Sequence, residues 1–285
     1  MPLSQVVGLD HVVIAVRDLD ASAKTWAQLG FTISPRGLHS AHLGSGNYTI
    51  MFGPDYIELL GIVTPTEHNA GTRAFLDERE GIERSAFTAL DAAKGVAELQ
   101  AKGIAATGPL DFSRPVDLPN GGKAEARFST MHWPSEEKPG GMRIFACQHL
   151  TREAVWIPEL QVHENTAKRI DRVEILSADP KQAAGHMARL IDQPVTAEPD
   201  GAYRVASGST RAAFVFLNHV QLVARYPGVA LGKLPGEGAI ALCIRVGDDE
   251  KALSAAGPSA VVVAPGRIAI PPSAATGVLV ELAIG

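Results

Sequence analysis

The sequence has few of the features that mark secreted, membrane-spanning or nucleic-acid-binding proteins. Only two of its 285 residues are cysteines. That is too few for a disulfide framework, so we expect Cys147 and Cys243 to be buried thiols in a reducing, cytoplasmic compartment. No apolar run is long enough to cross a bilayer, and the first residues lack the pattern of a signal peptide. Runs of basic residues are also missing, and the formal net charge is −5 with a pI near 6.0. Nucleic acid and anionic membranes are therefore not expected as partners.

The opening segment, residues 8–31, has a clear structural pattern. In residues 8–31, apolar alternation with period two predicts a strand. Asp18 and Asp20 are N-cap candidates of a helix that follows it, and Gly30 is the C-cap candidate. The apolar face of this unit is expected to supply the core residues Val12, Ile14, Val16, Trp26 and Leu29. His11 carries the one polar ring in the strand. Its role depends on which partner residues the rest of the chain supplies.

The same order of elements continues along the first half of the chain. The first unit is completed by predicted strands at Phe31–Ser34, Tyr48–Phe52 and Tyr56–Val63. A short helix over Gly71–Asp77 leads to a second unit, with a strand at Ser85–Leu90, a helix at Ala92–Lys102 and strands at Pro109–Leu118, Lys123–Met131 and Met142–Leu150. The turn between two of these strands is predicted at Asn120-Gly121-Gly122. Each unit thus has the order β-α-β-β-β.

The opening pattern returns 161 residues later. RIDRVEILSADPKQAAGHMARL matches GLDHVVIAVRDLDASAKTWAQL without a gap, and Asp171 falls on Asp10. The third unit is completed by predicted strands at Ala202–Ala206, Ala212–Leu217 and Val220–Ala224. The fourth comprises a strand at Ala239–Val246, a helix at Asp249–Ala256 and strands at Ala260–Val263, Arg267–Ile270 and Val278–Ile284. We therefore predict an α+β fold of four βαβββ modules in two paired-module domains, residues 1–157 and 169–285, joined by a linker at 158–168.

Several motifs carry a family resemblance. The segments GLDHVVIAV and DYIELLGI, set in four such units, resemble the vicinal oxygen chelate superfamily, which includes glyoxalase I, extradiol ring-cleaving dioxygenases and bleomycin-resistance proteins. The segments HLGSGNYTIMFGPDYIELLGI and FACQHLTREAVWIPELQVHENTA resemble its glyoxalase-like domain family. The resemblance implies that paired units form a cup, whose metal ligands come from the first and last strands of each unit.

Carried over to this sequence, the resemblance implies three metal ligands in the first half. His11 would come from the first strand of the first unit, Glu58 from its last strand, and His149 from the last strand of the second unit. The first strand of the second unit offers no ligand, whereas a glyoxalase I site normally has four. Two histidines and a carboxylate suit Fe2+, Mn2+, Ni2+ or Zn2+ and leave positions open for a substrate. Taken singly, each of the three is more often a core or surface residue.

The second half offers no comparable set. At the same offset Arg172 replaces His11, and an arginine cannot ligate a cation. Gln221 corresponds to the carboxylate, two positions further along, and only Glu281 keeps a ligand type. The second half is therefore expected to lack a metal and to serve as a scaffold, a lid or a dimer surface. Four units can form a complete monomer, and a homodimer through this half is the preferred alternative.

Further residues are candidates for the pocket. His42 lies in a Gly-rich loop that could overhang the cup, where it would act as a catalytic base or substrate donor; otherwise it packs within the loop. Candidate substrate-binding residues, from strand geometry, are Asn47, Tyr56, Arg127 and His132, the last of which could instead end a surface hairpin. His163 and Asn165 fall in the linker, where a structural hydrogen-bonding role is expected.

These features predict a metal-dependent enzyme of the dioxygenase, isomerase or lyase type, which acts on a small oxygenated substrate chelated by the metal. The alternative is a metal-free small-molecule-binding or drug-sequestering protein of the bleomycin-resistance type, in which the same residues line a pocket or hold the structure. The fold hosts both, so it does not separate them. Metal analysis of the purified protein separates them, because a metal-free binding protein should carry no stoichiometric metal.

Overall fold

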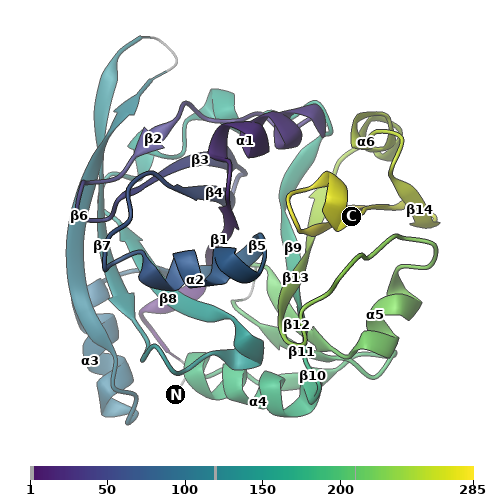
Figure 1. Ribbon diagram of the computed structural model, residues 1–285. Coiled ribbons are helices and arrows are strands. Elements are labelled where there is room, and N and C mark those ends of the chain that lie inside the picture. The colour runs from purple at the N-terminus through teal and green to yellow at the C-terminus, as the bar shows by residue number, and fades with distance from the viewer. Residues whose placement is uncertain (1–2, 119–120, 209) are drawn as a thin grey trace.

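Two eight-stranded sheets build the protein (Figure 1). The computed structural model describes residues 3–118, 121–208 and 210–285. The strand order is β2-β3-β4-β1-β5-β8-β7-β6 in the first sheet and β10-β11-β12-β9-β13-β16-β15-β14 in the second. Within each sheet two βαβββ modules join through their antiparallel first strands, β1 with β5 and β9 with β13. The predicted α+β fold of four modules is confirmed.

The first sheet and its helices come from the N-terminal half of the chain. The strands are β1 (Val6–Val16), β2 (Gly37–Leu38), β3 (Ser45–Met51), β4 (Tyr56–Ile62), β5 (Gly81–Ala89), β6 (Thr107–Asp117), β7 (Lys123–His132) and β8 (Arg143–His149). The helices are α1 (Leu19–Gln28), α2 (Ala70–Glu78) and α3 (Ala92–Ala101). Asp18 caps α1 as predicted, because its side chain accepts a hydrogen bond from the Ala21 N–H. Asp91 caps α3 in the same way.

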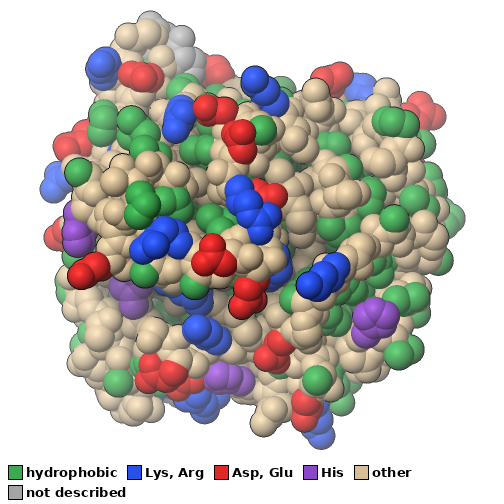
Figure 2. Space-filling model, in the orientation of Figure 1, with side chains coloured by type: hydrophobic (Ala, Val, Ile, Leu, Met, Phe, Trp, Pro, Cys, Tyr) green, Lys and Arg blue, Asp and Glu red, His purple; other side chains and the backbone are tan. Residues whose placement is uncertain are grey.

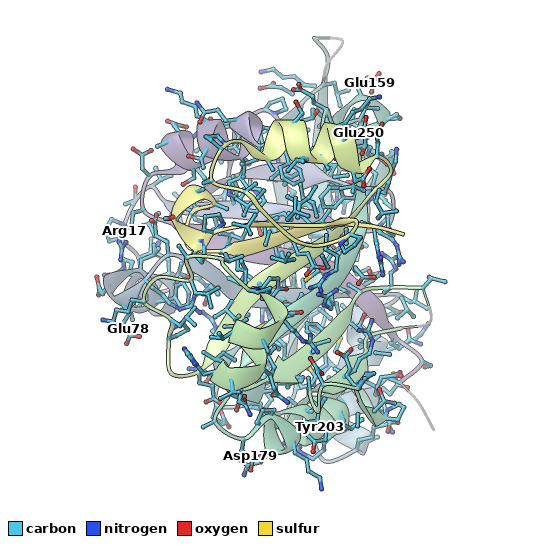
Figure 3. All side chains as sticks on the ribbon, turned by 90° about the vertical axis from the view of Figure 1, so that its right-hand side faces the viewer. Arg17, Glu78, Glu159, Asp179, Tyr203 and Glu250 are labelled. Carbon is cyan, nitrogen blue, oxygen red and sulfur yellow. The ribbon has the colours of Figure 1, made fainter. Side chains whose placement is uncertain are left out.

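The second sheet repeats this arrangement. Its strands are β9 (Ala167–Leu176), β10 (Val195–Ala197), β11 (Tyr203–Ala206), β12 (Ala213–Leu217), β13 (Gly238–Val246), β14 (Val261–Ala264), β15 (Arg267–Ile270) and β16 (Leu279–Ile284). The helices are α4 (Pro180–Ile191), α5 (His219–Arg225) and α6 (Asp249–Ala256). Figure 3 looks at this half from its own side, with Asp179 and Tyr203 at one end and Glu250 of α6 at the other.

Two predicted strands are wrong. The strand expected at Val220–Ala224 is part of α5, because Asn218 starts a helix there: its side chain accepts from the Gln221 N–H, and the Gln221 side chain accepts from the Asn218 N–H. The edge strand expected at Phe31–Ser34 instead follows further along, as the two-residue β2. The turn residue Asn120 lies outside the described residues.

One apolar core lies between the two sheets. It contains Val12 of β1 together with Val173 of β9, and the rings of Phe87 and Phe214 lie 5.5 Å apart across the two sheets. The five core residues predicted for the opening unit are all buried. Because this face of β1 is used by the core, the opposite face, which carries His11, is free to line a cavity.

The segment between the two sheets is bound to the first module. It contains two 3-10 turns, at Arg152–Ala154 and Pro158–Gln161. The His163 ring accepts from the Thr32 N–H through Nδ1, and its Nε2 contacts the Met51 carbonyl. Asn165 donates to the Leu29 carbonyl. These contacts are the structural hydrogen bonds expected for the two residues.

The surface carries acidic and basic side chains intermixed, without a broad patch of one sign on the face shown in Figure 2. Both cysteines are free and buried, as predicted. Among the described residues, the helices are all too short or too polar to span a bilayer.

Candidate functional site

A cavity of about 280 Å³ lies on the face of the first sheet that points away from the core. Its floor is formed by residues of β1, β4, β5 and β8, and its walls by β6, β7, the loop after β2 and the start of α2. His11, Glu58 and His132 line it, together with apolar side chains and three arginines, Arg84, Arg114 and Arg143. Strand pairing fixes where each of these side chains stands.

One row of the floor is aromatic. Strand pairing aligns Tyr56, His11, Ala86, Phe145 and His132 across five neighbouring strands. The His11 ring stacks on Tyr56 at 4.3 Å and meets Phe145 edge-on at 5.5 Å, and His132 stacks on Phe145 at 5.8 Å. These contacts give His11 a fixed ring plane between two aromatic neighbours.

The next row is charged. Strand pairing aligns Glu58 with Val13, Val13 with Arg84, and Arg84 with Arg143. Glu83, the extra residue of a β-bulge in β5, holds both guanidinium groups: its carboxylate lies 2.6 Å from Nε of Arg84 and 2.6 Å from Nη1 of Arg143. Two cations are therefore fixed beside the aromatic row by one buried carboxylate.

His11 is oriented from beneath by Asp10. A register shift between Leu9 and His11 makes Asp10 a bulge residue, so its side chain reaches the ring of its own neighbour. Oδ1 of Asp10 lies 2.8 Å from Nδ1 of His11 and 2.9 Å from Nε2 of His149, and Oδ2 accepts from the Thr88 hydroxyl at 2.8 Å. With its Nδ1 proton donated to Asp10, a neutral His11 presents a lone pair at Nε2.

Asp10 is ionised in this setting. Complete burial alone would raise the pKa of its carboxyl, but the charge of His149 and the hydrogen bonds from His11 and His149 lower that pKa well below its usual range. The carboxylate therefore stabilises positive charge on the imidazoles or on a cation that they bind.

Glu58 stands between two histidines. Its Oε2 lies 3.8 Å from Nε2 of His11, and its Oε1 lies 3.8 Å from Nε2 of His39, which follows β2. Oε1 also accepts from the Asn47 amide at 2.6 Å. Burial would raise the pKa of Glu58, but His39, His11 and Asn47 together lower it. His39 is itself held through Nδ1, which lies 2.8 Å from the Ser45 hydroxyl, and burial lowers its pKa.

His149 lies at a different depth from Glu58. Glu58 is aligned through β1 and β5 with Arg143, and His149 is six residues further along β8. His149 instead lies beside Asp10, which also contacts His11. The structure therefore brings His11 to Glu58, and His11 to His149 through Asp10, whereas no hydrogen bond or ion pair joins the two described residues Glu58 and His149. The tightest metal-type group among the described residues is Asp10, His11 and His149, whose ligand atoms lie within 4.8 Å of one another.

The other candidates divide between the cavity and its surroundings. Tyr56 and His132 line the cavity, and His42 lies at its mouth, where its ring is 5.4 Å from that of His68. Asn47 reaches the cavity through Glu58. Arg127 is exposed on β7 and is not among the lining residues, because period-two alternation turns it away from its neighbour Phe128, which does line the cavity.

Sequence reasoning missed three parts of this site. Asp10 was not predicted because strict alternation places its side chain on the face opposite His11. The β-bulge at Asp10 directs the side chain toward the His11 ring instead. His39 was hidden in an irregular loop, although its place in a Gly- and His-rich segment was a signal. Arg84 was missed because its strand was considered only as a source of metal ligands, and an arginine is not one.

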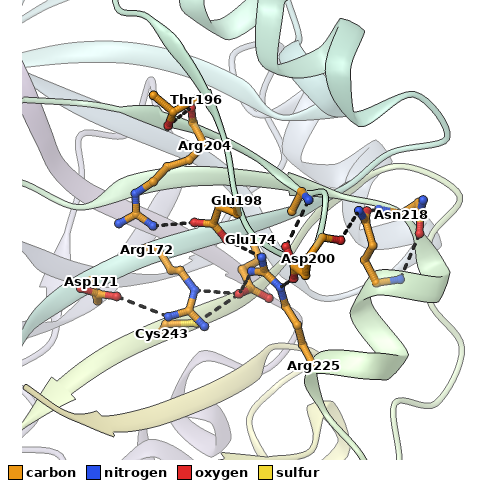
Figure 4. Close-up of polar contacts among 12 residues, drawn as sticks. Asp171, Arg172, Glu174, Thr196, Glu198, Asp200, Arg204, Asn218, Arg225 and Cys243 are labelled. Atoms are coloured by element: carbon orange, nitrogen blue, oxygen red, sulfur yellow. Dashed lines mark hydrogen bonds and ion pairs between the residues drawn. The ribbon is translucent and has the colours of Figure 1, made fainter.

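The second half has an ion-pair network where the first has histidines (Figure 4). Arg172 donates to Glu174 through Nε at 2.7 Å and to both oxygens of Glu281, at 3.2 and 3.1 Å. Arg225 donates to the same Glu174 at 2.9 Å. Strand pairing aligns Arg172, Cys243 and Glu281, so Glu281 stands at the level of Phe145 rather than His149. Gln221 belongs to the capping box of α5, and among the described residues its side chain donates only to the backbone carbonyl of Asp200, at 3.1 Å.

Comparisons with known proteins agree with this architecture. A family model described as a glyoxalase-like domain matches residues 9–191, more than half of the chain. Comparison with curated proteins gave no match.

Two solved structures share the fold over most of this chain, and a third match is weaker. A hypothetical protein from Staphylococcus aureus has a TM-score of 0.64 at 13% identity, and the match covers 97% of this chain and 99% of that one. A triple mutant of 4-hydroxymandelate synthase from Streptomyces coelicolor has a TM-score of 0.55 at 13% identity, covering 90% of this chain and 74% of that one. Methylmalonyl-CoA epimerase from Mycobacterium tuberculosis has a TM-score of 0.40 at 21% identity, covering 54% of this chain and 96% of that one. At such identities the likeness concerns the fold alone.

Proposed function

Since the chain belongs to the glyoxalase-like domain family of the vicinal oxygen chelate superfamily, we propose that it is a divalent-metal-dependent enzyme acting on a small oxygenated substrate in the cavity of the first sheet. One observation carries the proposal. His11 and His39 each place Nε2 3.8 Å from an oxygen of Glu58, while their other nitrogens are held by Asp10 and Ser45. Histidines that bind metals are typically held in this way through the second nitrogen.

Each histidine is within reach of a divalent cation shared with Glu58. Two atoms that each lie about 2.1 Å from one ion can be at most about 4.2 Å apart, so each 3.8 Å contact is within reach of a shared ion. Two histidines and one carboxylate on one face leave the remaining positions open, as Fe2+, Mn2+, Ni2+ and Zn2+ sites with bound substrate require. We assign His39, rather than His149, as the third ligand, because His39 lines the cavity and His149 does not.

The residues have distinct roles in this proposal. A cation bound here would act as a Lewis acid toward vicinal oxygens of the substrate, which suits dioxygenase, isomerase or lyase chemistry. Asn47 fixes the carboxylate of Glu58, and Asp10 fixes the His11 ring. Burial and the nearby Arg84 and Arg143 lower the pKa of His132 to about 4, so His132 is a neutral hydrogen-bonding group at pH 7.

His42, at the cavity mouth, is proposed to exchange a proton with the substrate. Cys147 also lines the cavity, but burial raises the pKa of its thiol well above the usual value. It is therefore unsuited to nucleophilic attack.

Metal content of histidine variants tests the proposal. The purified protein is incubated separately with Zn2+, Mn2+ and Fe2+ and freed of unbound metal, and the metal content per chain is then measured. We expect about one ion per chain, a loss of that ion in His11→Ala and His39→Ala, and its retention in His149→Ala. His219→Ala, a change of an exposed histidine on α5, is the matched control.

The outcomes separate the alternatives. If His149→Ala loses the ion and His39→Ala keeps it, the ligands belong to the group around Asp10. If the wild-type protein holds no stoichiometric metal, the enzyme proposal is overturned in favour of a metal-free small-molecule-binding protein.

A further inference from the structure

The arginines on the cavity floor point to a substrate class. Building on the proposed function, we propose that the cavity takes a small organic carboxylate, whose carboxylate group is bound by Arg84 and Arg114 and whose apolar body lies over the aromatic row. The proposed metal ligands do not need these arginines, so we attribute the arginines to substrate binding.

The geometry of Arg84 suits a planar anion. Its Nε lies 2.6 Å from Oε2 of Glu83 as an ion pair, and its Nη2 donates to the Thr72 hydroxyl at 3.2 Å, so the guanidinium is held from two sides. Arg143 is held by the same carboxylate, at 2.6 Å from Nη1. One carboxylate shared by two guanidinium groups leaves an excess of positive charge at this end of the floor, and remaining N–H groups of both side chains are free to meet a ligand oxygen.

Arg114 adds a third cation from the opposite wall. It lines the cavity from β6, and its guanidinium has no hydrogen bond or ion pair with any other described residue. Its guanidinium lies over Gly37 so closely that a Cβ there would come within 2.9 Å of Nη1. A half-buried guanidinium kept beside a cavity without a protein partner is a ready binding group for an anionic ligand.

The acidic groups around the cavity do not cancel this charge. Glu58 faces His11 and His39, and Glu83 is divided between two arginines. Asp111 is exposed at the rim and accepts from the Ser129 hydroxyl at 2.6 Å. Burial lowers the pKa of His132 and of His68, and the charges of Arg84 and Arg143 lower both further, together with the charge of His42 in the case of His68.

The rest of the cavity suits an apolar body. Phe112 and Phe128 stack at 5.0 Å on the wall, and Phe145 lies on the floor beside His11. Leu60 and Ile62 of β4 continue the apolar lining. A ligand with one anionic end and one flat apolar part therefore matches both surfaces, and a carboxylate pairs with one guanidinium edge through two coplanar oxygens. A free phosphate would use the arginines and leave the aromatic surface without a partner.

Calorimetric titration of the metal-free protein tests the inference apart from the metal. The probes are phenylacetate, its neutral analogue phenylacetamide, and inorganic phosphate, each at millimolar concentration. We expect phenylacetate to bind at least about tenfold more tightly than either of the others. Arg114→Gln and Arg84→Gln should each weaken phenylacetate binding by at least about tenfold, and Arg84→Lys should restore part of it.

Two controls keep the test decisive. Arg36→Gln changes an exposed arginine that pairs with Asp20 outside this cavity, and it should bind phenylacetate as the wild type does. If Arg84→Gln fails to fold because Glu83 loses a partner, Arg114→Gln still decides the result. Equal binding of acid and amide, stronger binding of phosphate, no binding of phenylacetate, or wild-type binding by Arg114→Gln would each overturn the inference. Metal content, measured separately, reports failure of the proposed function.

Discussion

The two halves of the molecule show two ways to fill the same position in a sheet. In the first, His11 lies level with Tyr56 and Phe145 and faces a cavity. In the second, Arg172 stands at the corresponding place and carries its own positive charge into a network of buried carboxylates. A neutral imidazole can bind a cation, whereas a guanidinium takes the place of one.

The comparison explains why only the first half is expected to hold a metal. Glu174 is fully buried and is contacted by Arg172, Arg225 and the Tyr226 hydroxyl. Glu281 is contacted by Arg172 and by Arg267, at 2.6 Å. These carboxylates are already neutralised within the chain, while in the first half Glu58 faces two imidazoles at 3.8 Å. The duplicated modules thus differ in whether the chain itself supplies the balancing cation.

Removal of the Arg172 guanidinium, the positive charge within the second-half network, should have the largest effect on stability. Arg172→Met leaves Glu174 and Glu281 buried with fewer partners, so we expect the free energy of unfolding to fall by about 3–5 kcal/mol. His39→Ala, which removes one partly buried imidazole from the first half, should cost about 1 kcal/mol. Chemical denaturation of both variants measures the difference. Similar losses for the two would contradict the contrast between a structural cation and an open site.

The contact between the halves should depend on pH. Asp55 is fully buried beside β9 and accepts from the Ile170 N–H at 3.0 Å. Burial raises its pKa to about 7 from the ordinary 3.8. A carboxyl whose pKa is raised by folding destabilises the folded state when ionised, so stability should fall as the pH rises from about 4 to about 7 and stay lowered above that.

Asp55→Asn removes this penalty. The separation of the two pKa values corresponds to at most roughly 4 kcal/mol, and we expect the variant to gain about 2–3 kcal/mol of unfolding free energy at pH 8 and little at pH 4.5. Denaturation curves across this range measure the gain. A gain that does not change with pH would show that Asp55 is ionised throughout.

A smaller effect is expected from the group that holds Glu58. Asn47→Ala removes the amide donated to Oε1 at 2.6 Å and leaves all three proposed ligands in place. Metal affinity should therefore fall by about 10–100-fold with the ion still bound at saturation. Competition with a chelator of known affinity measures the change. Complete loss of the ion would instead make Asn47 part of the ligand set, and an unchanged affinity would remove Glu58 from it.

The smallest predicted effect lies at the contact of α1 with the second half. The Trp26 indole donates to the Thr276 hydroxyl at 2.8 Å across the two halves. Thr276→Val keeps the side-chain shape and removes this acceptor, so we expect a loss of about 1 kcal/mol in thermal or chemical unfolding. A loss above about 3 kcal/mol would mean that the hydroxyl does more than accept this bond.

The fold could be predicted well because its signals are local. Period-two alternation, a cap such as Asp18, and the repeated opening segment each lie within a short stretch of sequence. The errors also have local causes. The alternating segment HVQLVA resembles a strand, but the Asn218 capping box makes it a helix. A two-residue edge strand such as β2 has no pattern long enough to detect.

The site could be predicted only in part, because its geometry depends on register. His11 and Glu58 followed from the family resemblance, and the structure places them together. His149 lies on an expected strand, but strand pairing sets it at another depth, beside Asp10. The bulges that aim Asp10 and Glu83 are irregularities of pairing between distant strands, so alternation within one strand gives no sign of them.

The central claim is that a cation binds among His11, His39 and Glu58 and that the second half holds none. Anomalous X-ray scattering from crystals grown with Zn2+ tests both parts in one measurement. The account predicts one strong peak per chain, about 2.0–2.2 Å from Nε2 of each of the two histidines and from the carboxylate, and none among the second-half carboxylates. A peak between Asp10 and His149, a peak beside Glu281, or the absence of any peak would contradict it.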